Sequence, residues 1–310
     1  MRVLIAEQEH ACYARLLAEH APHLQLLASA DPAELRGLAG KASIWLGEPD
    51  LLAELLRQGH VPHWLQSTWA GITPLLAADL PHHYRLTRAV GIFGQVMAEY
   101  MLTYLLNHER QVQSRLRSQV QRQWDARPGS SLAGREVLIV GCGDIGQRVA
   151  EYLASFAMKV RGVASTVRRQ APFLEIAGLE ALPRLVAQAD YVINLLPDTL
   201  ATHDLYDAAL LRRFKTSALL LNAGRGVAVV DDDLVRALEQ GHLAGAVIDV
   251  CREEPLPASH PFWTAPRLTL TGHSSAPTSP AAMVGLFLEN VQAYQAGQPL
   301  RGEVDFQRGY

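Results

Sequence analysis

Cysteine is scarce in this sequence of 310 residues. Three cysteines occur, Cys12, Cys142 and Cys251, an odd number with no close pairing along the chain. A disulfide framework or a four-cysteine zinc site is therefore not expected, and a reducing compartment is the natural location. Charge of one sign is also lacking, because 28 Lys and Arg side chains stand against 31 Asp and Glu side chains for a formal net charge of −3. This balance argues against a nucleic-acid partner.

Long hydrophobic runs are absent as well. The two longest stretches without Asp, Glu, Lys or Arg cover residues 58–78 and 268–288, and both contain His and Pro. Neither is predicted to span a membrane. The four apolar residues 3–6 are too few for the core of a signal peptide. We expect a cytoplasmic protein without a membrane partner.

Recognisable metal-ligand spacing is also missing. Histidines occur in two close pairs, His60 with His63 and His82 with His83, but neither pair shows HExxH spacing and Pro62 interrupts the first. We therefore expect no metal site. The second pair is expected to line a cleft instead.

What the sequence does have is an alternation of short apolar runs with amphipathic stretches, which is typical of an α/β fold with parallel strands. The length is about twice the most common domain size, so two domains are expected. A polar stretch at residues 107–127 separates two such patterns, and the second starts with the dense apolar run at residues 137–140. The polar stretch is interpreted as a solvated helix, with a subunit-contacting arm as the alternative.

A glycine-rich loop follows that apolar run directly. In Gly141-Cys142-Gly143-Asp144-Ile145-Gly146, the first glycine would make a tight turn, the second would let the backbone approach a pyrophosphate, and the third would let the helix pack on the strand. The start of the following helix offers free N–H groups and the positive end of its dipole. This strand–loop–helix context predicts a dinucleotide site. Its candidate cofactor-binding residues are Gly141, Gly143, Asp144, Ile145 and Gly146.

The end of the next predicted strand indicates which dinucleotide binds. NAD-binding proteins usually carry an acidic residue there, which accepts hydrogen bonds from the ribose 2′-OH. Here the segment contains Ser165, Thr166, Arg168 and Arg169 and no carboxylate. A guanidinium can bind a 2′-phosphate with two hydrogen bonds. We predict NADP(H), with NAD possible; the alternative is an ordinary exposed basic turn.

Three further segments carry reactive side chains just after predicted strands. They place Arg225, Glu254 and His273 in fixed order along the chain. Ligands of open α/β sheets bind at the carboxyl ends of the strands, where all three segments begin. Histidine suits proton transfer because it gains and loses a proton near neutral pH. The planar fork of arginine matches a carboxylate.

The order of these motifs resembles the D-isomer-specific 2-hydroxyacid dehydrogenase family. The glycine loop, N-x-x-R-G, D-V-x-x-x-E-P and a late histidine all occur in sequence. Ser165 with Arg168, residues 194–197 and the ending at residues 304–310 are most similar to the glyoxylate/hydroxypyruvate reductase A branch. The resemblance covers essentially the whole chain. It implies two Rossmann-like or flavodoxin-like domains with an inter-domain cleft, a substrate domain at residues 1–97 and 281–310 and a dinucleotide-binding Rossmann domain at residues 98–280.

The resemblance also implies roles for individual residues. His273 would be the catalytic acid/base, Glu254 its hydrogen-bond partner, and Arg225 a catalytic residue that binds the substrate carboxylate. The backbone of Ala70, Gly71 and Ile72 would bind the same carboxylate. Further cofactor contacts would come from Leu196, Pro197, Ala223, Gly224, Asp249 and Ser275. Gly272 stands where the family usually has proline.

The expected activity is NADPH-dependent reduction of a small 2-oxo acid, of the glyoxylate or hydroxypyruvate type, to the D-2-hydroxy acid. Two alternatives stay open. One is an NAD-dependent dehydrogenase of the same family with another substrate preference. The other is a non-catalytic dinucleotide-sensing protein on the same fold. A homodimer is expected from the resemblance alone.

Overall fold

The computed structural model describes residues 1–307 and 309, and the chain divides into two compact units. Unit 1 contains Met1–Ile92 and Thr278–Tyr310, and unit 2 contains Phe93–Pro277. Each unit is built on a parallel sheet, which confirms the predicted α/β class with two parallel-sheet domains. The boundaries expected at residues 97/98 and 280/281 fall within the first turns of two helices. A helical pattern carries no mark of the unit against which each turn packs.

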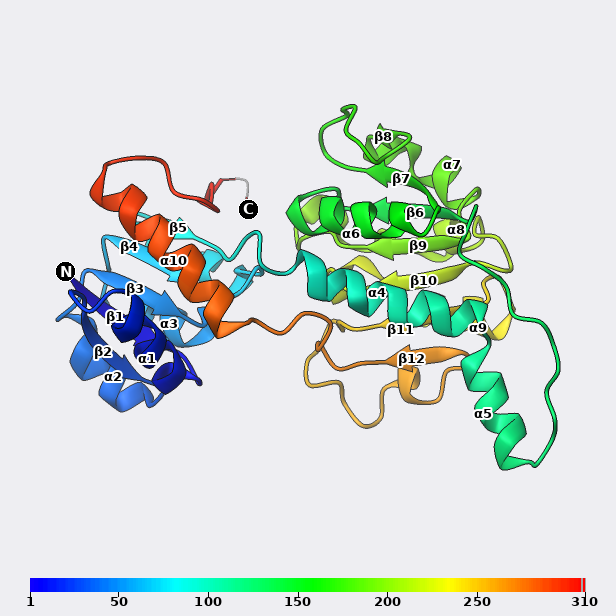
Figure 1. Ribbon diagram of the computed structural model, residues 1–310, viewed down its shortest axis with the longest axis horizontal. Coiled ribbons are helices and arrows are strands. Elements are labelled where there is room, and N and C mark those ends of the chain that lie inside the picture. The colour runs from blue at the N-terminus through cyan, green and yellow to red at the C-terminus, as the bar shows by residue number, and fades with distance from the viewer. Residues whose placement is uncertain (308, 310) are drawn as a thin grey trace. The chain divides into compact units, whose positions relative to one another are not determined.

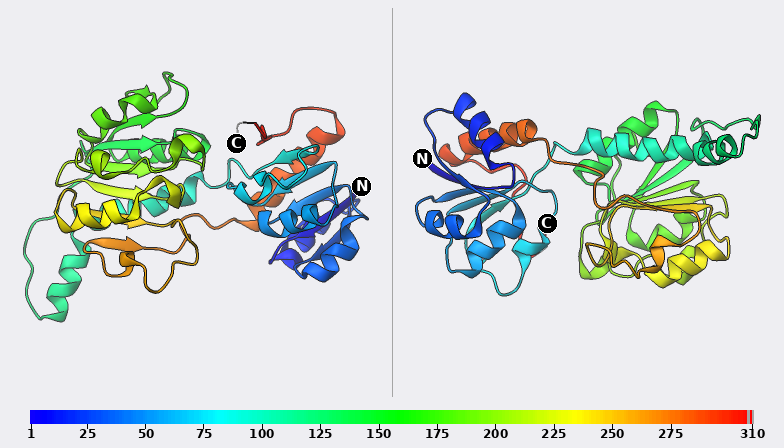
Figure 2. Two further views of the ribbon diagram at one scale, coloured as in Figure 1. Left: turned by 180° about the vertical axis from the view of Figure 1, so that it is seen from behind. Right: turned by 90° about the horizontal axis from the view of Figure 1, so that it is seen from below.

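Unit 1 is a five-stranded parallel sheet with helices on both faces (Figure 1). Its elements are β1 (Arg2–Ala6), α1 (His10–His20), β2 (Gln25–Ser29), α2 (Pro32–Ala39), β3 (Ile44–Gly47), α3 (Pro49–Arg57), β4 (Trp64–Ser67), η1 (Thr73–Leu76), β5 (Arg85–Thr87) and α10 (Pro280–Gln295). The strand order β2-β1-β3-β4-β5 is the flavodoxin-like order. Helices α1 and α10 cover one face, and α2 and α3 cover the other (Figure 2).

The helix α10 returns to unit 1 because its apolar side chains find partners there. The Trp64 ring of β4 stacks on Phe287 and on Tyr294, with centroids 5.3 Å apart in both cases. Beside them, Asn290 Nδ2 donates to Gln66 Oε1 at 2.9 Å. Aromatic stacking of this kind adds to the free energy gained by burying the rings.

Unit 2 is a seven-stranded parallel sheet. Its elements are α4 (Gly94–Glu109), α5 (Val112–Val120), β6 (Glu136–Val140), α6 (Asp144–Ser155), β7 (Lys159–Val163), β8 (Ile176–Ala177), η2 (Leu179–Ala181), α7 (Leu182–Val186), β9 (Tyr191–Asn194), η3 (Leu200–Thr202), α8 (Ala208–Leu211), β10 (Leu219–Asn222), η4 (Gly226–Ala228), α9 (Asp231–Glu239), β11 (Gly245–Ile248), η5 (Pro261–Trp263) and β12 (Leu268–Leu270). The order β12-β11-β10-β9-β6-β7-β8 is the Rossmann order with one added strand at the β11 edge.

Alternate residues of the unit 2 strands face two separate cores. Leu138 and Val140 of β6 pack with side chains from α7, α8 and α9, whereas Val137 and Ile139 pack with those from α4 and α6. Because both faces are covered, the strands are apolar throughout, as expected for a parallel sheet. This double coverage explains why the run at residues 137–140 is so strongly hydrophobic.

The register of unit 2 brings the strand ends into line. Val140 pairs with Asn194, Asn194 with Asn222, Asn222 with Ile248, and Ile248 with Leu270. The loops that follow these strands therefore leave the sheet along a single edge. Ligands bind at this edge in doubly wound sheets, next to the point where the strand order reverses between β6 and β9.

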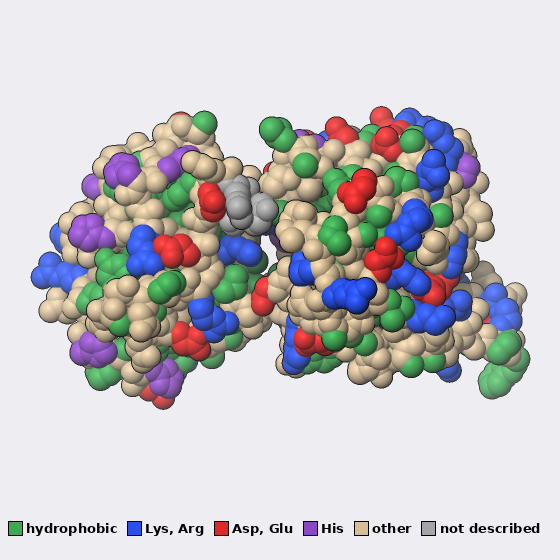
Figure 3. All heavy atoms as spheres, turned by 90° about the horizontal axis from the view of Figure 1, so that it is seen from above, with side chains coloured by type: hydrophobic (Ala, Val, Ile, Leu, Met, Phe, Trp, Pro, Cys, Tyr) green, Lys and Arg blue, Asp and Glu red, His purple; other side chains and the backbone are tan. Residues whose placement is uncertain are grey.

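On the face drawn in Figure 3, acidic and basic side chains are interspersed over unit 2, and several histidines lie on unit 1. Among the helices of residues 1–307, none has both the length and the apolar character that crossing a bilayer requires.

Candidate active site

The three glycines of the loop between β6 and α6 have different surroundings. Gly141 has a φ of 109°, and a Cβ there would lie 2.8 Å from the Leu195 carbonyl group. A Cβ on Gly146 would lie 2.1 Å from the Gly141 carbonyl oxygen. Gly143, by contrast, is exposed and has open space where its Cβ would be. The loop therefore leaves room at the start of α6, beside Asp144 and Ile145, for the phosphates of a dinucleotide.

The loop after β7 is joined to this glycine loop by Arg168. Its guanidinium donates to the Cys142 carbonyl oxygen at 2.5 Å, to the Thr166 carbonyl oxygen at 3.2 Å and to Gln170 Oε1 at 2.7 Å. Ser165 and Arg169 are exposed on the same loop. The arrangement places hydroxyl groups and guanidinium groups on the loop that contacts the glycine loop. Burial raises the pKa of the Cys142 thiol to about 11, so this cysteine stays protonated.

Two buried asparagines hold the loop that carries Arg225. Asn222 Oδ1 accepts from Asn194 Nδ2 at 2.9 Å and from the Gly224 N–H at 3.3 Å, and Asn222 Nδ2 donates to the Arg225 carbonyl oxygen at 3.2 Å. Arg225 itself donates to the Gly224 carbonyl oxygen at 2.6 Å. Sequence reasoning assigned no role to the two asparagines, although N-x-x-R-G was recognised. Both amides are fully buried at strand ends. The sequence signal that was missed is the asparagine at the end of each apolar strand.

The predicted cofactor residues Leu196, Pro197, Ala223 and Gly224 lie on the loops after β9 and β10. A Cβ on Gly224 would lie 2.7 Å from the Leu196 carbonyl oxygen, so the two loops are in backbone contact. The side chains of Leu196 and Ala223 are buried, whereas Pro197 is exposed. These positions surround the strand-order reversal between β6 and β9.

Glu254 and His273 form a hydrogen-bonded pair. His273 Nδ1 lies 2.7 Å from Glu254 Oε2, and Glu254 Oε1 accepts from the Cys251 N–H at 2.7 Å. The carboxylate is thus held by its own loop while it orients the ring. With Nδ1 bonded to the carboxylate, Nε2 is the nitrogen left to exchange a proton with a substrate. Both side chains are partly exposed, at 37% and 52%.

Asp249 holds the histidine segment. Its carboxylate accepts from Thr271 Oγ1 at 2.5 Å and from the backbone N–H groups of Ser274 and Ser275 at 2.9 and 3.2 Å. Its carbonyl oxygen accepts from the His273 N–H at 2.6 Å. The predicted cofactor residues Asp249 and Ser275 are both buried here.

The backbone at His273 is left-handed over two residues, since Gly272 has a φ of 64° and His273 a φ of 56°. Proline has its φ fixed near −65° and could not occupy the Gly272 position in this conformation. Glycine at this position, where the family usually has proline, therefore goes with a left-handed backbone. Glycine adopts such angles at little cost.

The arginine and glutamate loops are in contact. A Cβ on Gly226 would lie 2.0 Å from the Cys251 carbonyl carbon. Arg252 donates from Nε to the Val229 carbonyl oxygen at 2.8 Å and from Nη2 to the Val227 carbonyl oxygen at 3.0 Å, and it pairs with Asp204. The residues before Glu254 are thereby fixed to the residues after Arg225. Arg252 was not recognised in the sequence because this role depends on the fold.

The predicted substrate loop of unit 1 starts directly after β4. Ile72 is buried in the core of unit 1, so its side chain is not available for binding, whereas Ala70 and Gly71 are half-buried. Within residues 1–307 and 309, the backbone N–H groups of these three residues have no hydrogen-bond acceptor. Consecutive N–H groups without an acceptor are suited to bind an anion.

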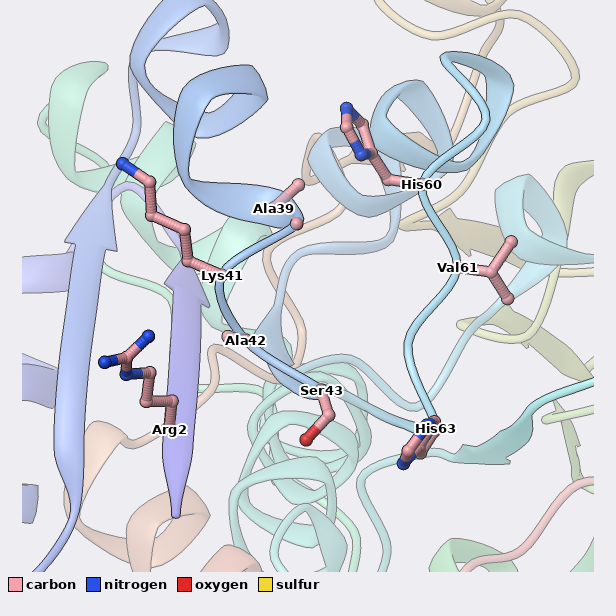
Figure 4. A pocket seen from close by; sticks show the side chains of 9 residues that line it. Arg2, Ala39, Lys41, Ala42, Ser43, His60, Val61 and His63 are labelled. Atoms are coloured by element: carbon pink, nitrogen blue, oxygen red, sulfur yellow. The ribbon is translucent and has the colours of Figure 1, made fainter.

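The two histidine pairs lie elsewhere in unit 1. His60 and His63 line a cavity of about 430 Å³ together with the basic side chains of Arg2 and Lys41, at the amino ends of the strands (Figure 4). His82 stacks on Phe306, with centroids 4.6 Å apart. Among the described residues no group of three His, Cys, Asp or Glu side chains has a metal-binding arrangement. Of the C-terminal motif, Arg308 and Tyr310 lie outside the described residues.

Comparisons with known sequences agree with the motifs. Residues 102–275 match the family described as D-isomer specific 2-hydroxyacid dehydrogenase, NAD binding domain. The glyoxylate/hydroxypyruvate reductase A of Serratia proteamaculans is 36% identical over 217 residues, which cover 70% of this chain and 69% of that protein. The enzyme of the same name from Escherichia fergusonii is 34% identical over 249 residues, or 78% and 80% of the two chains.

Solved structures extend the similarity to the whole chain. A D-isomer specific 2-hydroxyacid dehydrogenase family protein from Aeromonas salmonicida is 40% identical and has a TM-score of 0.93, with 98% of this chain and 99% of that chain covered. An NADPH-dependent glyoxylate/hydroxypyruvate reductase from Sinorhizobium meliloti, solved with NADP and sulfate, is 26% identical, with a TM-score of 0.88 and coverage of 100% and 99%. The chain therefore belongs to the D-isomer specific 2-hydroxyacid dehydrogenase family.

Proposed function

We propose that this protein reduces a small 2-oxo acid, of the glyoxylate or hydroxypyruvate type, to the D-2-hydroxy acid with NADPH. The observation that carries the proposal is the 2.7 Å bond between His273 and Glu254, at the edge of a Rossmann sheet where the Arg225 loop also begins. An acid/base and a cation at the ligand edge of this sheet are the groups that carbonyl reduction needs. Relatives named as glyoxylate/hydroxypyruvate reductases support the substrate class.

The residues have distinct tasks in the proposed reaction. Bound NADPH supplies the hydride. His273 gives a proton from Nε2 to the carbonyl oxygen of the substrate, and Glu254 keeps the ring oriented and stabilises its charged form. Arg225 binds the substrate carboxylate with its guanidinium. In unit 1, the N–H groups of residues 70–72 are proposed to bind a carboxylate oxygen.

The pocket for the cofactor is proposed to use the glycine loop and the loop after β7. Open space at Gly143 and the start of α6 fit the pyrophosphate. Ser165, Arg168 and Arg169 fit a 2′-phosphate, since no carboxylate is present to repel it. Leu196, Pro197, Ala223, Gly224, Asp249 and Ser275 are proposed as the remaining contacts.

A screen of NADPH oxidation tests the activity. Glyoxylate, hydroxypyruvate, pyruvate and bulkier 2-oxo acids would each be added to the enzyme with NADPH or NADH, and the loss of reduced cofactor followed. We expect glyoxylate and hydroxypyruvate to be reduced fastest, and His273→Ala to lower turnover by several orders of magnitude with nearly unchanged NADPH binding. Binding of cofactor without oxidation by any 2-oxo acid would support the sensing protein instead.

The choice of cofactor has its own variant. Arg168→Ala should raise the Michaelis constant for NADPH roughly tenfold or more, because a charge-assisted bond to the 2′-phosphate is lost. The constant for NADH should change little. Arg212→Ala, an exposed arginine on the same unit, is the matched control. An equal effect on both cofactors would contradict the 2′-phosphate role.

We also propose a homodimer, and α5 supports it. This helix has no buried residue, and Val112, Leu116 and Val120 follow one another at four-residue spacing along one face, with exposures of 38%, 51% and 85%. Trp124, just beyond it, is 95% exposed. Light scattering should give a dimer for the wild type and a monomer for Val120→Asp, with Arg117→Ala on the same helix as control. A monomeric wild type would refute this proposal.

A cytoplasmic location is proposed from the thiols. All three cysteines lie in the described part of the chain and are free. Free thiols fit a reducing compartment. Thiol titration of protein purified without reductant and then unfolded should find three reactive groups per chain, and fewer would argue for an oxidising compartment.

A further inference from the structure

Two acidic side chains lie side by side at the carboxyl edge of the unit 1 sheet. Glu7 directly follows β1 and Glu48 directly follows β3, and these two strands are paired with Ala6 opposite Gly47. A Cβ on Gly47 would lie 2.0 Å from the Ala6 carbonyl oxygen, so no side chain separates the two strand ends. The two glutamates therefore leave the sheet side by side, where two negative charges would repel each other.

Glu48 is tied to the segment that carries Glu7. Glu48 Oε1 accepts from the N–H of Gln8, the residue after Glu7, at 2.8 Å, and Glu48 is close enough to raise the pKa of Glu7. Two carboxyl groups can bond to each other only if one of them carries a proton. Glu7 is the buried member, with 7% of its surface exposed, and the proton is placed on it.

The second contact of Glu7 leads to the substrate loop. Thr68 Oγ1 donates to Glu7 Oε2 at 2.7 Å. Thr68 is completely buried and is the residue that immediately precedes Trp69 and Ala70. Its N–H donates to the Gly47 carbonyl oxygen at 2.9 Å, and its carbonyl oxygen accepts from Thr278 Oγ1 at 3.1 Å. The start of the loop is therefore fixed at three points, and one of them depends on an ionisable group.

We propose that Glu7 and Glu48 share a proton to position the loop at residues 69–72, and that losing this proton weakens binding of the 2-oxo acid with little effect on turnover. The proposal rests on the proposed function, in which the N–H groups of this loop bind the substrate carboxylate. Glu7 is a positioning residue, because it acts on the loop through Thr68.

The groups around Glu7 indicate where the proton is lost. Burial, together with the hydrogen bond to Glu48 and the negative charges of Glu48 and Glu9, raises the pKa of Glu7 to about 8, although the bond from Thr68 acts in the opposite direction. From α1, His10 Nδ1 lies 3.2 Å from the Glu7 carbonyl oxygen and Tyr13 is buried nearby. Because the pKa is raised, the proton is present at neutral pH and is lost as the pH rises through about 8.

The test compares wild type with Glu7→Gln at neutral and mildly alkaline pH. If only the protonated pair aligns the loop, the Michaelis constant for the 2-oxo acid should rise about tenfold between about pH 7 and about pH 9. The amide introduced by Glu7→Gln can accept from Thr68 and donate to Glu48 and has no proton to lose, so the constant of this variant should rise by less than about twofold. Both proteins keep His273, so the difference between their pH profiles belongs to Glu7.

Glu19→Gln is the matched control, because it neutralises an exposed carboxylate of α1 that is not among the groups that raise the pKa of Glu7. It should behave as the wild type. A tenfold rise in Glu7→Gln equal to that of the wild type would overturn the proposal. Thr68→Val, which lacks the hydroxyl, should show a raised constant already at neutral pH and no further rise specific to the pair.

A readout without substrate separates this proposal from the proposed function. Hydrogen exchange of the backbone at residues 68–76 should be faster in the wild type than in Glu7→Gln at about pH 9, and equal in the two at about pH 7. Equal exchange at both pH values would overturn the anchoring role even if the enzyme reduces 2-oxo acids. A failed activity screen with the expected exchange difference would overturn the proposed function and leave the anchor supported.

Discussion

Replacing Asp249 by asparagine removes one charge from the centre of the histidine segment. The carboxylate accepts three hydrogen bonds, from Thr271 Oγ1 and from the N–H groups of Ser274 and Ser275. An amide keeps one acceptor oxygen, and its NH₂ group then points at a donor. Because Asp249 and Ser275 are both buried, at 1% and 6% exposure, water cannot replace the lost acceptor.

The magnitude follows from these bonds. A buried N–H left without an acceptor costs about 1–3 kcal/mol, and each remaining bond loses part of its charge assistance, roughly 0.5–1 kcal/mol. We therefore expect Asp249→Asn to lower the free energy of unfolding of unit 2 by about 2–5 kcal/mol. If half of this appears as misplacement of His273, turnover should fall about 5- to 70-fold.

Chemical denaturation, turnover and NADPH binding together decide what Asp249 does. A loss of stability and turnover with unchanged NADPH affinity would assign Asp249 to positioning, whereas weaker NADPH binding would assign it to the cofactor contact that the family resemblance implies. Asp232→Asn, an exposed aspartate of the same unit, controls for the charge change. Wild-type stability and turnover in Asp249→Asn would refute the reasoning.

Two further sites in unit 2 give predictions of the same kind. Gly272→Pro should lower turnover at least about tenfold and more than Gly272→Ala, since proline cannot adopt the φ of 64°. Gly241→Ala is the control, because Gly241 also has a positive φ and open space where its Cβ would be. It should lose ~1 kcal/mol of stability, as Gly272→Ala should, but keep its turnover. Wild-type turnover in Gly272→Pro would show that the segment tolerates the other backbone. Glu254→Gln should lower turnover roughly 10- to 100-fold with unchanged NADPH affinity, because a neutral amide no longer stabilises the charged ring. Glu253→Gln, the exposed neighbour, should be silent in the same steady-state assay, and equal losses in both variants would contradict the pairing.

The parts of the site that could be predicted are those fixed by local pattern and by parallel topology. Glu254 and His273 follow two strands that pair with Ile248 opposite Leu270. Parallel strands end at the same edge, so short loops after both bring their side chains together. The glycine loop could also be predicted from the sequence, because a buried strand, a turn that needs positive φ and a helix start are all local features.

Elements shorter than one period of their pattern could not be predicted. β5 spans three residues, Arg85–Thr87, and β8 spans two, Ile176–Ala177. Alternation needs at least about four residues to be recognised, and both strands exist because a neighbouring strand offers hydrogen-bonding partners.

Buried polar groups are the remaining class, and they are where the sequence is least informative. Glu7 and Glu48 are separated by 40 intervening residues, and in the sequence each looks like an ordinary surface glutamate. Only the pairing of β1 with β3 brings the two glutamates side by side, and burial is then the largest cause that raises the pKa of Glu7 to about 8. A glutamate in a sequence is normally assigned to the surface because burying its charge is costly. The same cost of burial raises the pKa of Glu7 and makes the pair sensitive to pH. Burial of Glu7 therefore explains both why its role could not be predicted from the sequence and how it would regulate the adjacent loop.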